Sequence, residues 1–144
     1  MFVNQPVEDV SRVMDFVGLD MAQLHGEESP EYCRLLNRRV IKAIGLENGT
    51  LPAVGAFDSD TLILLDAHDP LQRGGTGRTV NWDAAREIVA SRKTILAGGL
   101  NPDNVAHAVA AVRPFGIDVS SGVESAPGLK DPVRLRRFFE ALHD

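Results

Sequence analysis

The sequence is poor in cysteine, in aromatic residues and in long hydrophobic runs. One cysteine, Cys33, stands among 144 residues, which excludes an internal disulfide framework and agrees with a reducing cytoplasm. No apolar stretch reaches the roughly 18 to 20 residues of a membrane span, and the N-terminus lacks the pattern of a signal sequence. We therefore expect a cytoplasmic protein that does not enter a membrane.

Positive charge is also scarce. Fifteen Lys and Arg residues stand against twenty Asp and Glu residues, and the formal net charge is -5. The basic residues form no dense patch, so we do not expect nucleic acid as a partner. His and Cys do not cluster at metal-ligand spacing, so we expect no metal. An acidic protein can still bind a phosphate group locally, through backbone amides and a helix N-terminus.

Short apolar runs alternate with segments of helical period along the whole chain. The predicted strands are Met21–Leu24, Val40–Ile44, Thr61–Leu65, Thr94–Ala97 and Ile117–Val119. Helical spacing is clearest in residues 7–17 and 105–112. This alternation predicts a single α/β domain over residues 1–144 with a parallel sheet. The pattern leaves open whether that sheet is open or closed into a barrel.

Helix starts are marked by a capping side chain in front of a proline. This pattern occurs at Ser29, Asn101 and Asp131, and Asn81 can cap a helix that begins at Trp82. The last helix is expected to carry one apolar stripe, which comprises Leu135, Phe138, Phe139 and Leu142.

Polar and glycine residues gather where predicted strands end, in AQLHGEE, LLDAHD, AGGLNP and DVSSGVE. The carboxyl ends of parallel strands form one edge, where α/β proteins bind ligands. Asp66 directly follows four apolar residues, and apolar surroundings favour the neutral acid form that general-acid catalysis uses. An equally good interpretation is that Asp66 caps the following loop.

The stretch after Asp66 carries weaker signals. His68 and Asp69 are expected to be loop residues. The glycine-rich segment Gln72–Trp82 lacks the lysine of a nucleotide-binding loop. It predicts either a mobile active-site loop or a plain connection.

The segments AGGLNP and DVSSGVE reinforce each other because they follow the last two predicted strands. Their candidate ligand groups are backbone amides and hydroxyls, from Gly98, Gly99, Ser120, Ser121 and Gly122. Two such loops beside helix N-termini are typical of the phosphate site of (β/α)8 enzymes. The alternative is a pair of tight turns without a ligand.

Taken in order, these motifs resemble the phosphoribosylanthranilate isomerase family of tryptophan biosynthesis. The matching segments, from residue 2 to the C-terminus, are FVNQPVEDV, QLHGEE, LLD, GGTGRTVNW, AGGLNPDNV and GIDVSSGVESAPGLKD. The resemblance implies a (β/α)8 TIM barrel. This chain then matches the C-terminal part of that barrel, from about the end of the third strand, as an incomplete barrel of about five βα units.

The resemblance also implies an activity. It is the Amadori rearrangement of N-(5-phosphoribosyl)anthranilate to 1-(2-carboxyphenylamino)-1-deoxyribulose 5-phosphate, the third step of tryptophan biosynthesis from chorismate, without a cofactor. By motif, Asp66 is then the general acid that protonates the ribose ring oxygen and opens the ring to a Schiff base. Gln23, His25 and Asp118 then bind the substrate, and the amides and hydroxyls listed above bind its phosphate.

The chain departs from the family pattern in its first residues. In the family, the general base is a cysteine in a KICG-like motif at the end of the first strand, and an early arginine binds the anthranilate carboxylate. Both are absent from this chain. Cys33 is expected to be a buried apolar residue in a helix on the outside of the barrel, and so not a substitute for the base.

Five strands cannot close an eight-stranded barrel, and exposed strand edges tend to pair with another chain. Three interpretations follow: a fragment of a longer gene product, an assembly with a second copy or a complementary N-terminal piece, or an inactive relative. Two other functions compete with the isomerase. One is a different phosphate-binding barrel, such as indole-glycerol-phosphate synthase or the tryptophan synthase alpha chain. The other is a non-catalytic, phosphate-binding or oligomerising partial barrel, which the missing base favours.

Overall fold

A computed structural model describes residues 1–46, 53–66 and 82–143 of the chain. Its first elements are α1 (Val7–Val17), β1 (Met21–Leu24), α2 (Pro30–Leu36), β2 (Arg39–Gly45), a 3-10 turn (Val54–Ala56) and β3 (Leu62–Asp66). They are followed by α3 (Trp82–Ser91), β4 (Thr94–Ala97), α4 (Val105–Val112), β5 (Gly116–Ile117), a second 3-10 turn (Ser121–Val123), β6 (Glu124–Ala126), β7 (Leu129–Lys130) and α5 (Pro132–Glu140).

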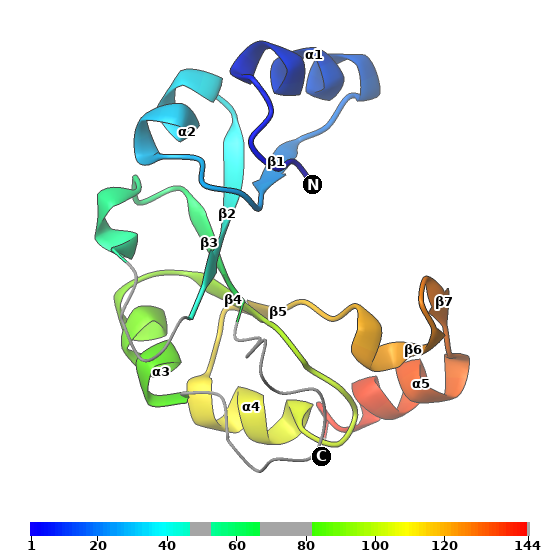
Figure 1. Ribbon diagram of the computed structural model, residues 1–144. Coiled ribbons are helices and arrows are strands. Elements are labelled where there is room, and N and C mark those ends of the chain that lie inside the picture. Colours follow the sequence, from blue (N-terminus) through cyan, green and yellow to red (C-terminus); the bar gives the residue numbers. More distant parts are fainter. Residues whose placement is uncertain (47–52, 67–81, 144) are drawn as a thin grey trace.

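Strands β1 to β5 form one parallel sheet in the order in which they occur along the chain. A doubly wound sheet reverses its strand order at a switch point, and this sheet does not. When right-handed crossovers all proceed in one direction, the helices cover one face of the sheet. Figure 1 shows this arrangement, with α1 to α4 along the outside of an arc of strands. The winding is that of barrel-type α/β proteins.

The helix-covered face of the sheet carries two apolar clusters. Met14 of α1 packs with Leu24 of β1 in one of them, and Leu65 of β3 packs with Val105 of α4 in the other. The opposite face, called the inner face below, carries a smaller cluster of Ala43, Leu64 and Ala97. Both faces of these strands are apolar, as expected for a parallel sheet of an α/β protein.

The predicted strands agree closely with the structure. Met21–Leu24 and Thr94–Ala97 coincide with β1 and β4. Strand β2 extends one residue further at each end than Val40–Ile44, and β3 is displaced by one residue from Thr61–Leu65. The strand predicted over Ile117–Val119 is wrong in its bounds, because β5 comprises only Gly116–Ile117. Beyond it, one further ladder-like hydrogen bond runs from the Asp118 amide to the Leu96 carbonyl, at 2.8 Å.

Two of the predicted helix caps are confirmed. Ser29 Oγ accepts a hydrogen bond from the Tyr32 amide at 3.1 Å, and Asp131 accepts from the amides of Val133 and Arg134. In both cases the proline that follows is the first residue of the helix, where its missing amide hydrogen has no cost. Asn81 lies outside the described residues.

The predicted helix start at Asn101 is wrong, because α4 begins only at Val105. Asn101 and Asn104 use their side chains to form a turn instead. Asn101 Oδ1 accepts from the Asp103 amide at 2.9 Å, and Asn104 Oδ1 accepts from the Asn101 amide at 2.8 Å. Asn side chains commonly compete with the helix in this way.

The predicted apolar stripe of the last helix is partly wrong. Phe138 is buried at 1% exposure, whereas Phe139 is 57% exposed. Its ring meets the Phe138 ring edge to face, with the centroids 6.0 Å apart. Helix α5 ends at Glu140, so Leu142 lies beyond it, although both Leu135 and Leu142 pack against the core.

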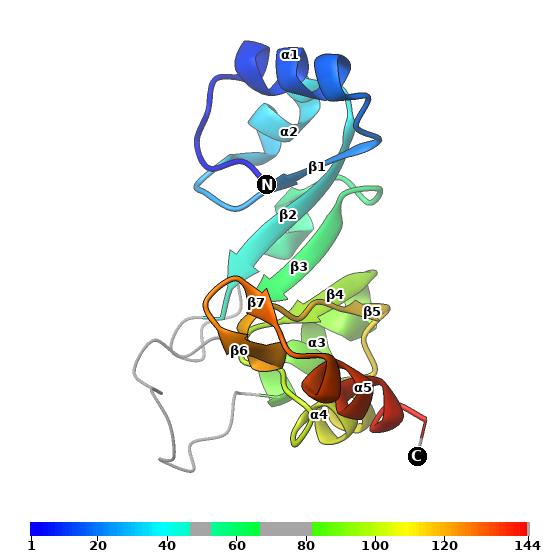
Figure 2. The same ribbon diagram turned by 90° about the vertical axis from the view of Figure 1, so that its right-hand side faces the viewer.

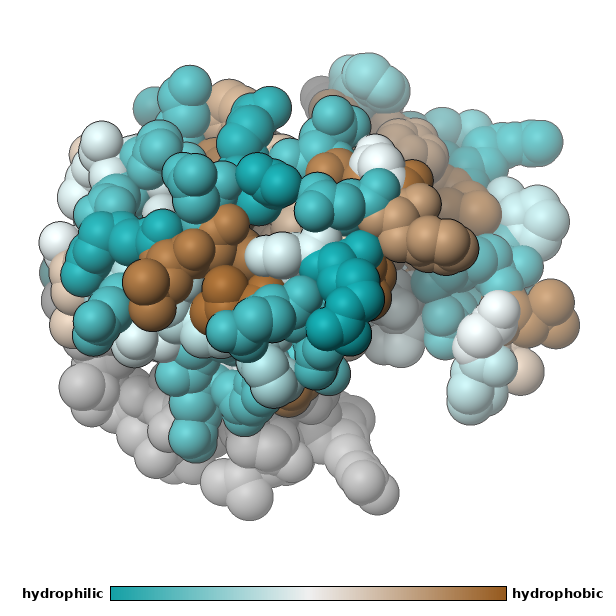
Figure 3. Space-filling model, turned by 90° about the horizontal axis from the view of Figure 1, so that it is seen from above, coloured by the Kyte–Doolittle hydropathy of each residue, from teal (hydrophilic) through white to brown (hydrophobic). Residues whose placement is uncertain are grey.

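Exposed apolar side chains occur on α1. Phe16 is 91% exposed, and Val13 and Val17 are also exposed. Figure 3, which views the molecule from above, shows brown apolar side chains on this side among teal polar ones. None of the helices in the described ranges is long and apolar enough to cross a membrane.

Candidate functional site

The carboxyl ends of the strands meet at one edge of the sheet. Asp66, the last residue of β3, stands level with Gly45 of β2 and with Ala97 of β4. Figure 2 shows the arrowheads of β2 and β3 side by side at this edge. The predicted site residues either lie among the last two residues of β1 and β3 or follow β1, β4 and β5, so the parallel pairing places them at the carboxyl ends of these strands.

His25 and Asp66 approach each other at this edge. His25 Nε2 lies 3.8 Å from Asp66 Oδ2, and the two side chains are 35% and 31% exposed. Asp66 follows Leu64 by two residues on the same strand, so its side chain belongs to the inner face. The Nδ1 atom of His25 is enclosed and has no hydrogen-bond partner among the described residues. A carboxyl group beside an imidazole, both part-buried, is suited to proton transfer.

Gln23 and Asp118 lie at or near the carboxyl ends of the two outer strands of the parallel sheet. Gln23 stands level with Ile41, which packs on the inner-face cluster, and Gln23 is half-buried. Asp118 follows β5 directly and is exposed. Gln23 is thus the last residue but one of β1, two residues before His25 on the same face, and Asp118 lies directly beyond the carboxyl end of β5.

The two glycine-containing loops contact each other. Gly98 and Gly99 adopt φ values of 89° and 65°, a left-handed conformation that favours glycine. A Cβ atom on Gly122 would lie 1.8 Å from the carbonyl oxygen of Leu100, so only glycine permits this approach. The loops after β4 and β5 are thus packed backbone to backbone.

Backbone amides in these loops are available to a ligand. Within the described residues, the amides of Gly98, Gly99, Ser121 and Gly122 donate to no protein acceptor. Ser120 and Ser121 are exposed. The structure therefore brings the two loops predicted to bind a phosphate group into contact, and these four amides have no acceptor among the described residues.

Lys130 supports the loop after β5 and was not among the predicted site residues. Its Nζ donates to the Ser120 carbonyl at 2.9 Å and to Glu124 Oε1 at 2.7 Å. The hydrogen bond from Lys130, aided by the Gly128 amide, holds the pKa of Glu124 below its usual value. The motif GLKD that contains Lys130 was part of the family resemblance, but its spacing alone did not reveal this contact.

Lys42 and Glu28 form a buried ion pair close to His25, which the sequence analysis also missed. The signal that would reveal it is a lysine in the middle of an apolar strand. Burial acts to raise the pKa of Glu28, but hydrogen bonds from the Asn4 amide and from Lys42 outweigh it and hold this pKa below its usual value.

Cys33 lies in α2, buried in the cluster that joins α1, β1 and β2 on the helix side of the sheet. Burial raises the pKa of its thiol. The prediction of a buried cysteine in a helix is confirmed. The thiol lies on the helix-covered side of the sheet, away from the inner face.

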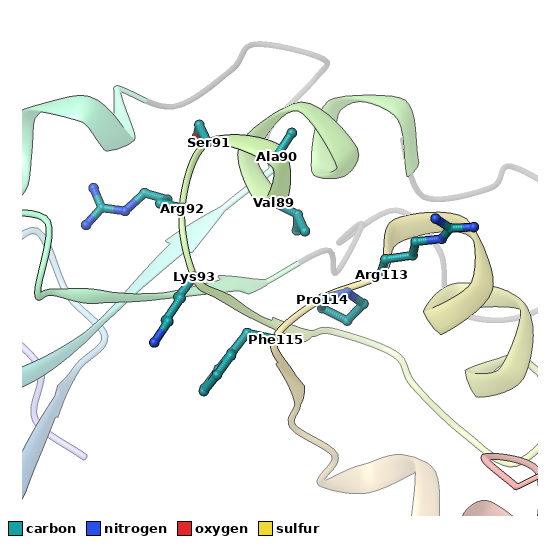
Figure 4. Close-up of a pocket in the computed structure, with 8 residues that line it drawn as sticks. All are labelled: Val89, Ala90, Ser91, Arg92, Lys93, Arg113, Pro114 and Phe115. Atoms are coloured by element: carbon teal, nitrogen blue, oxygen red, sulfur yellow. The ribbon is translucent and has the colours of Figure 1, made fainter.

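A pocket of about 360 Å³ lies at the opposite edge of the sheet, before β4 and β5. Figure 4 shows Lys93 and Phe115 side by side in its lining, and Lys93 Nζ lies 5.1 Å from the Phe115 ring centroid. Ligands of α/β proteins bind at the carboxyl ends of the strands, so this pocket is not the candidate site.

Some sequence expectations lie outside what the structure describes. His68, Asp69 and the segment 72–81 belong to the residues that are not described. Within the described ranges, no group of three or more His, Cys, Asp and Glu side chains is arranged to hold a metal ion.

Comparison with known proteins agrees with this geometry. The family model described as "N-(5'phosphoribosyl)anthranilate (PRA) isomerase" matches residues 1–141. Proteins named N-(5'-phosphoribosyl)anthranilate isomerase from Pelobacter propionicus and Citrifermentans bemidjiense are 49% and 50% identical to the chain. The matches cover 96% and 95% of this chain, which spans 66% of the length of each relative.

Solved structures give the same result. The phosphoribosyl anthranilate isomerase of Thermotoga maritima superposes with a TM-score of 0.84 at 39% identity, over 99% of this chain and 70% of that one. A second isomerase structure, in complex with reduced 1-(o-carboxyphenylamino)-1-deoxyribulose 5-phosphate, gives a TM-score of 0.81 at 37% identity, over 99% of this chain and 69% of that one. The chain described here belongs to the phosphoribosylanthranilate isomerase family.

Proposed function

We propose that the chain takes part in the isomerisation of N-(5-phosphoribosyl)anthranilate to 1-(2-carboxyphenylamino)-1-deoxyribulose 5-phosphate, the third step of tryptophan biosynthesis from chorismate. The observation that carries this proposal is the approach of His25 to Asp66 at the carboxyl edge of the sheet. A relative of known structure, 37% identical and superposed over 99% of this chain, was solved in complex with the reduced form of that product. The reaction needs no cofactor, and we propose that it takes place in the cytoplasm.

In this proposal Asp66 is the general acid. It protonates the ring oxygen of the ribose, which opens the ring to a Schiff base. Gln23, His25 and Asp118 contact the substrate near the reacting atoms. Their common position along the carboxyl edge supports these roles.

We propose that the two contacting loops bind the substrate's phosphate. The donors are the amides of Gly98, Gly99, Ser121 and Gly122 and the hydroxyls of Ser120 and Ser121. A doubly charged phosphate is bound well by several amides that converge without a lysine. The absence of a protein acceptor for these amides among the described residues supports the proposal.

In this proposal Cys33, the single cysteine of the sequence, does not serve as the general base, because it is buried in α2 on the helix side of the sheet. We propose that the chain corresponds to the C-terminal part of the family's barrel, as an incomplete barrel. The chain spans about two thirds of its relatives' length, and the exposed Phe16 on α1 supports the idea that further structure covers this side. A complementary N-terminal piece or a second copy of the chain would cover the open strand edges.

The proposal is tested by turnover of N-(5-phosphoribosyl)anthranilate, with Asp66→Asn as the matched variant. The DNA upstream of the Met1 codon is read in parallel for an in-frame strand that ends in a Cys-Gly pair. If such a strand exists, the longer product is assayed. A rate no greater than that of the Asp66→Asn variant overturns the enzymatic proposal.

The second candidate function is a non-catalytic, phosphate-binding partial barrel. It is favoured by the contact between the two loops that carry the candidate phosphate donors and by the position of Cys33 on the helix side of the sheet. It predicts that a phosphoribose analogue binds, with slower amide exchange at Gly98, Gly99 and Ser121, but that no turnover occurs. Unchanged exchange at these amides contradicts both candidate functions.

A further inference from the structure

A buried ion pair lies behind the candidate site. Lys42 Nζ and Glu28 Oε2 are 3.0 Å apart, and the two side chains are only 4% and 1% exposed. Lys42 follows Val40 by two residues on β2, so it belongs to the helix-covered face of the sheet. Burying two charges has a desolvation cost that apolar side chains of similar volume do not have. Stability alone is therefore a poor explanation of the pair.

The pair holds the peptide groups on both sides of His25. Lys42 Nζ donates to the Leu24 carbonyl at 3.4 Å and to the Gly26 carbonyl at 2.6 Å. Glu28 Oε2 accepts from the Gly26 amide at 2.9 Å. The peptide bond before His25 is thus held through its oxygen, and the peptide bond after His25 is held through its nitrogen.

The N-terminal segment completes this frame. Glu28 Oε1 accepts from the Asn4 amide at 2.8 Å, and Asn4 Oδ1 accepts from the Glu27 amide at 2.7 Å. The His25 amide donates to the Phe2 carbonyl at 2.8 Å. A Cβ atom on Gly26 would lie 2.3 Å from Asn4 Oδ1, so the turn has no room to shift toward this segment.

These contacts have one consequence at the candidate site. The backbone of His25 is fixed from the helix-covered side of the sheet, while its imidazole lies 3.8 Å from the Asp66 carboxylate. We propose that Lys42 and Glu28 are positioning residues, which hold the turn after β1 so that the His25 imidazole faces Asp66. The inference rests on the proposed function only for what the site catalyses, not for the geometry itself.

The test uses nuclear magnetic resonance of the His25 ring in the whole 144-residue chain. In the wild type, Asp66→Asn is expected to move the ring ¹³C and ¹⁵N signals of His25, because the two groups are in contact. In a Lys42→Met/Glu28→Gln background the same substitution is expected to change the His25 ring signals by no more than about half of the wild-type change. Exchange of the Gly26 amide is expected to be at least about tenfold faster in that background.

Arg92 offers a matched control at the opposite edge of the sheet. Its guanidinium donates to the carbonyls of Val54, Phe57, Asp58 and Thr61, so it too fixes a loop through backbone oxygens. Arg92→Lys is expected to lower stability but to leave the response of His25 to Asp66→Asn unchanged. A purely structural role of Lys42 and Glu28 predicts the same behaviour for both backgrounds.

The outcome is decisive in either direction. If the response of His25 stays at its wild-type size in the folded double variant, the inference is overturned. If the double variant does not fold, Glu28→Gln alone is measured, since the amide can still accept one of the two backbone hydrogen bonds. An unchanged response of His25 in folded Glu28→Gln then overturns the inference, and a reduced response supports it. No substrate is involved, so loss of turnover in the assay above leaves this result intact.

Discussion

The imidazole of His25 lies 3.8 Å from the carboxylate of Asp66 although β2 lies between β1, which His25 follows, and β3, which ends at Asp66. Strand β2 presents Ala43 and Gly45 on the inner face at this point, and neither residue has a side chain long enough to separate the pair. The approach therefore depends on small residues in the intervening strand as well as on His25 and Asp66 themselves. It is the relationship on which the proposed chemistry depends.

The lowered pKa of Glu28 predicts how the free energy of unfolding changes at acidic pH. Its pKa is held below its usual value in the folded chain by the Asn4 amide and Lys42, against the effect of burial. Such a group contributes stability above its unfolded pKa, about 4.3, and that contribution is lost as the pH falls through the lower folded pKa. We expect the urea midpoint of the wild type to exceed that of Glu28→Gln at neutral pH, and the difference to shrink below about pH 4.

Asp58→Asn serves as the control for this measurement. Asp58 pairs with Arg34 across the surface, and both side chains are 53% exposed. An exposed pair contributes little, so its removal should hardly change the midpoint at any pH. A difference between wild type and Glu28→Gln that is constant with pH would contradict the prediction.

Gly122→Ala tests the contact between the two loops. The added methyl group meets the Leu100 carbonyl, so the backbone must move, at an expected cost of about 1 to 3 kcal/mol in the free energy of unfolding. Phosphate affinity, measured by calorimetry, should fall with it. Gly55→Ala is the control, since nothing lies within 4 Å of its added methyl group. Equal effects of the two substitutions would refute the close-contact explanation.

Lys130→Met tests the support of the loop after β5. Loss of the hydrogen bond to the Ser120 carbonyl should loosen the loop and weaken phosphate binding by about three- to tenfold, the effect of one hydrogen bond. The comparison is Arg137→Met, which breaks an exposed ion pair between α5 and Asp103. Calorimetric titration of both variants with a phosphoribose analogue measures the difference. If Arg137→Met weakens binding as much, the effect is one of general charge.

The burial of Cys33 predicts that its thiol reacts slowly in the folded chain. Burial raises the pKa of the thiol, and only the thiolate reacts quickly with alkylating or disulfide reagents. Labelling of the folded chain at about pH 8 should be at least tenfold slower than labelling in urea. Cys33→Ala should leave phosphate binding unchanged. Rapid labelling under native conditions would show that the thiol is accessible after all.

Much of the candidate site could be predicted from local pattern. A polar residue or a glycine directly after an apolar run marks a strand end. For this reason the sequence placed Asp66, Gly98 and Gly99 at the carboxyl ends of their strands, as the structure does. Lys42 and Glu28 could not be found in this way. A lysine within an apolar strand marks Lys42 as unusual, but its pairing with Glu28 depends on the register between β1 and β2, which no local rule predicts.

By itself the sequence determined the order of strands and helices, the helix caps at Ser29 and Asp131, and the edge of the sheet at which polar residues gather. These features follow from side-chain periodicity and from hydrogen bonds between residues close in the chain. Only the tertiary structure decided the distance from His25 to Asp66, the approach of Gly122 to Leu100, and the late start of α4. The first two join segments that are far apart in the chain, and in the third a side-chain turn outcompetes the helix, so each depends on which of several local possibilities the packed chain stabilises.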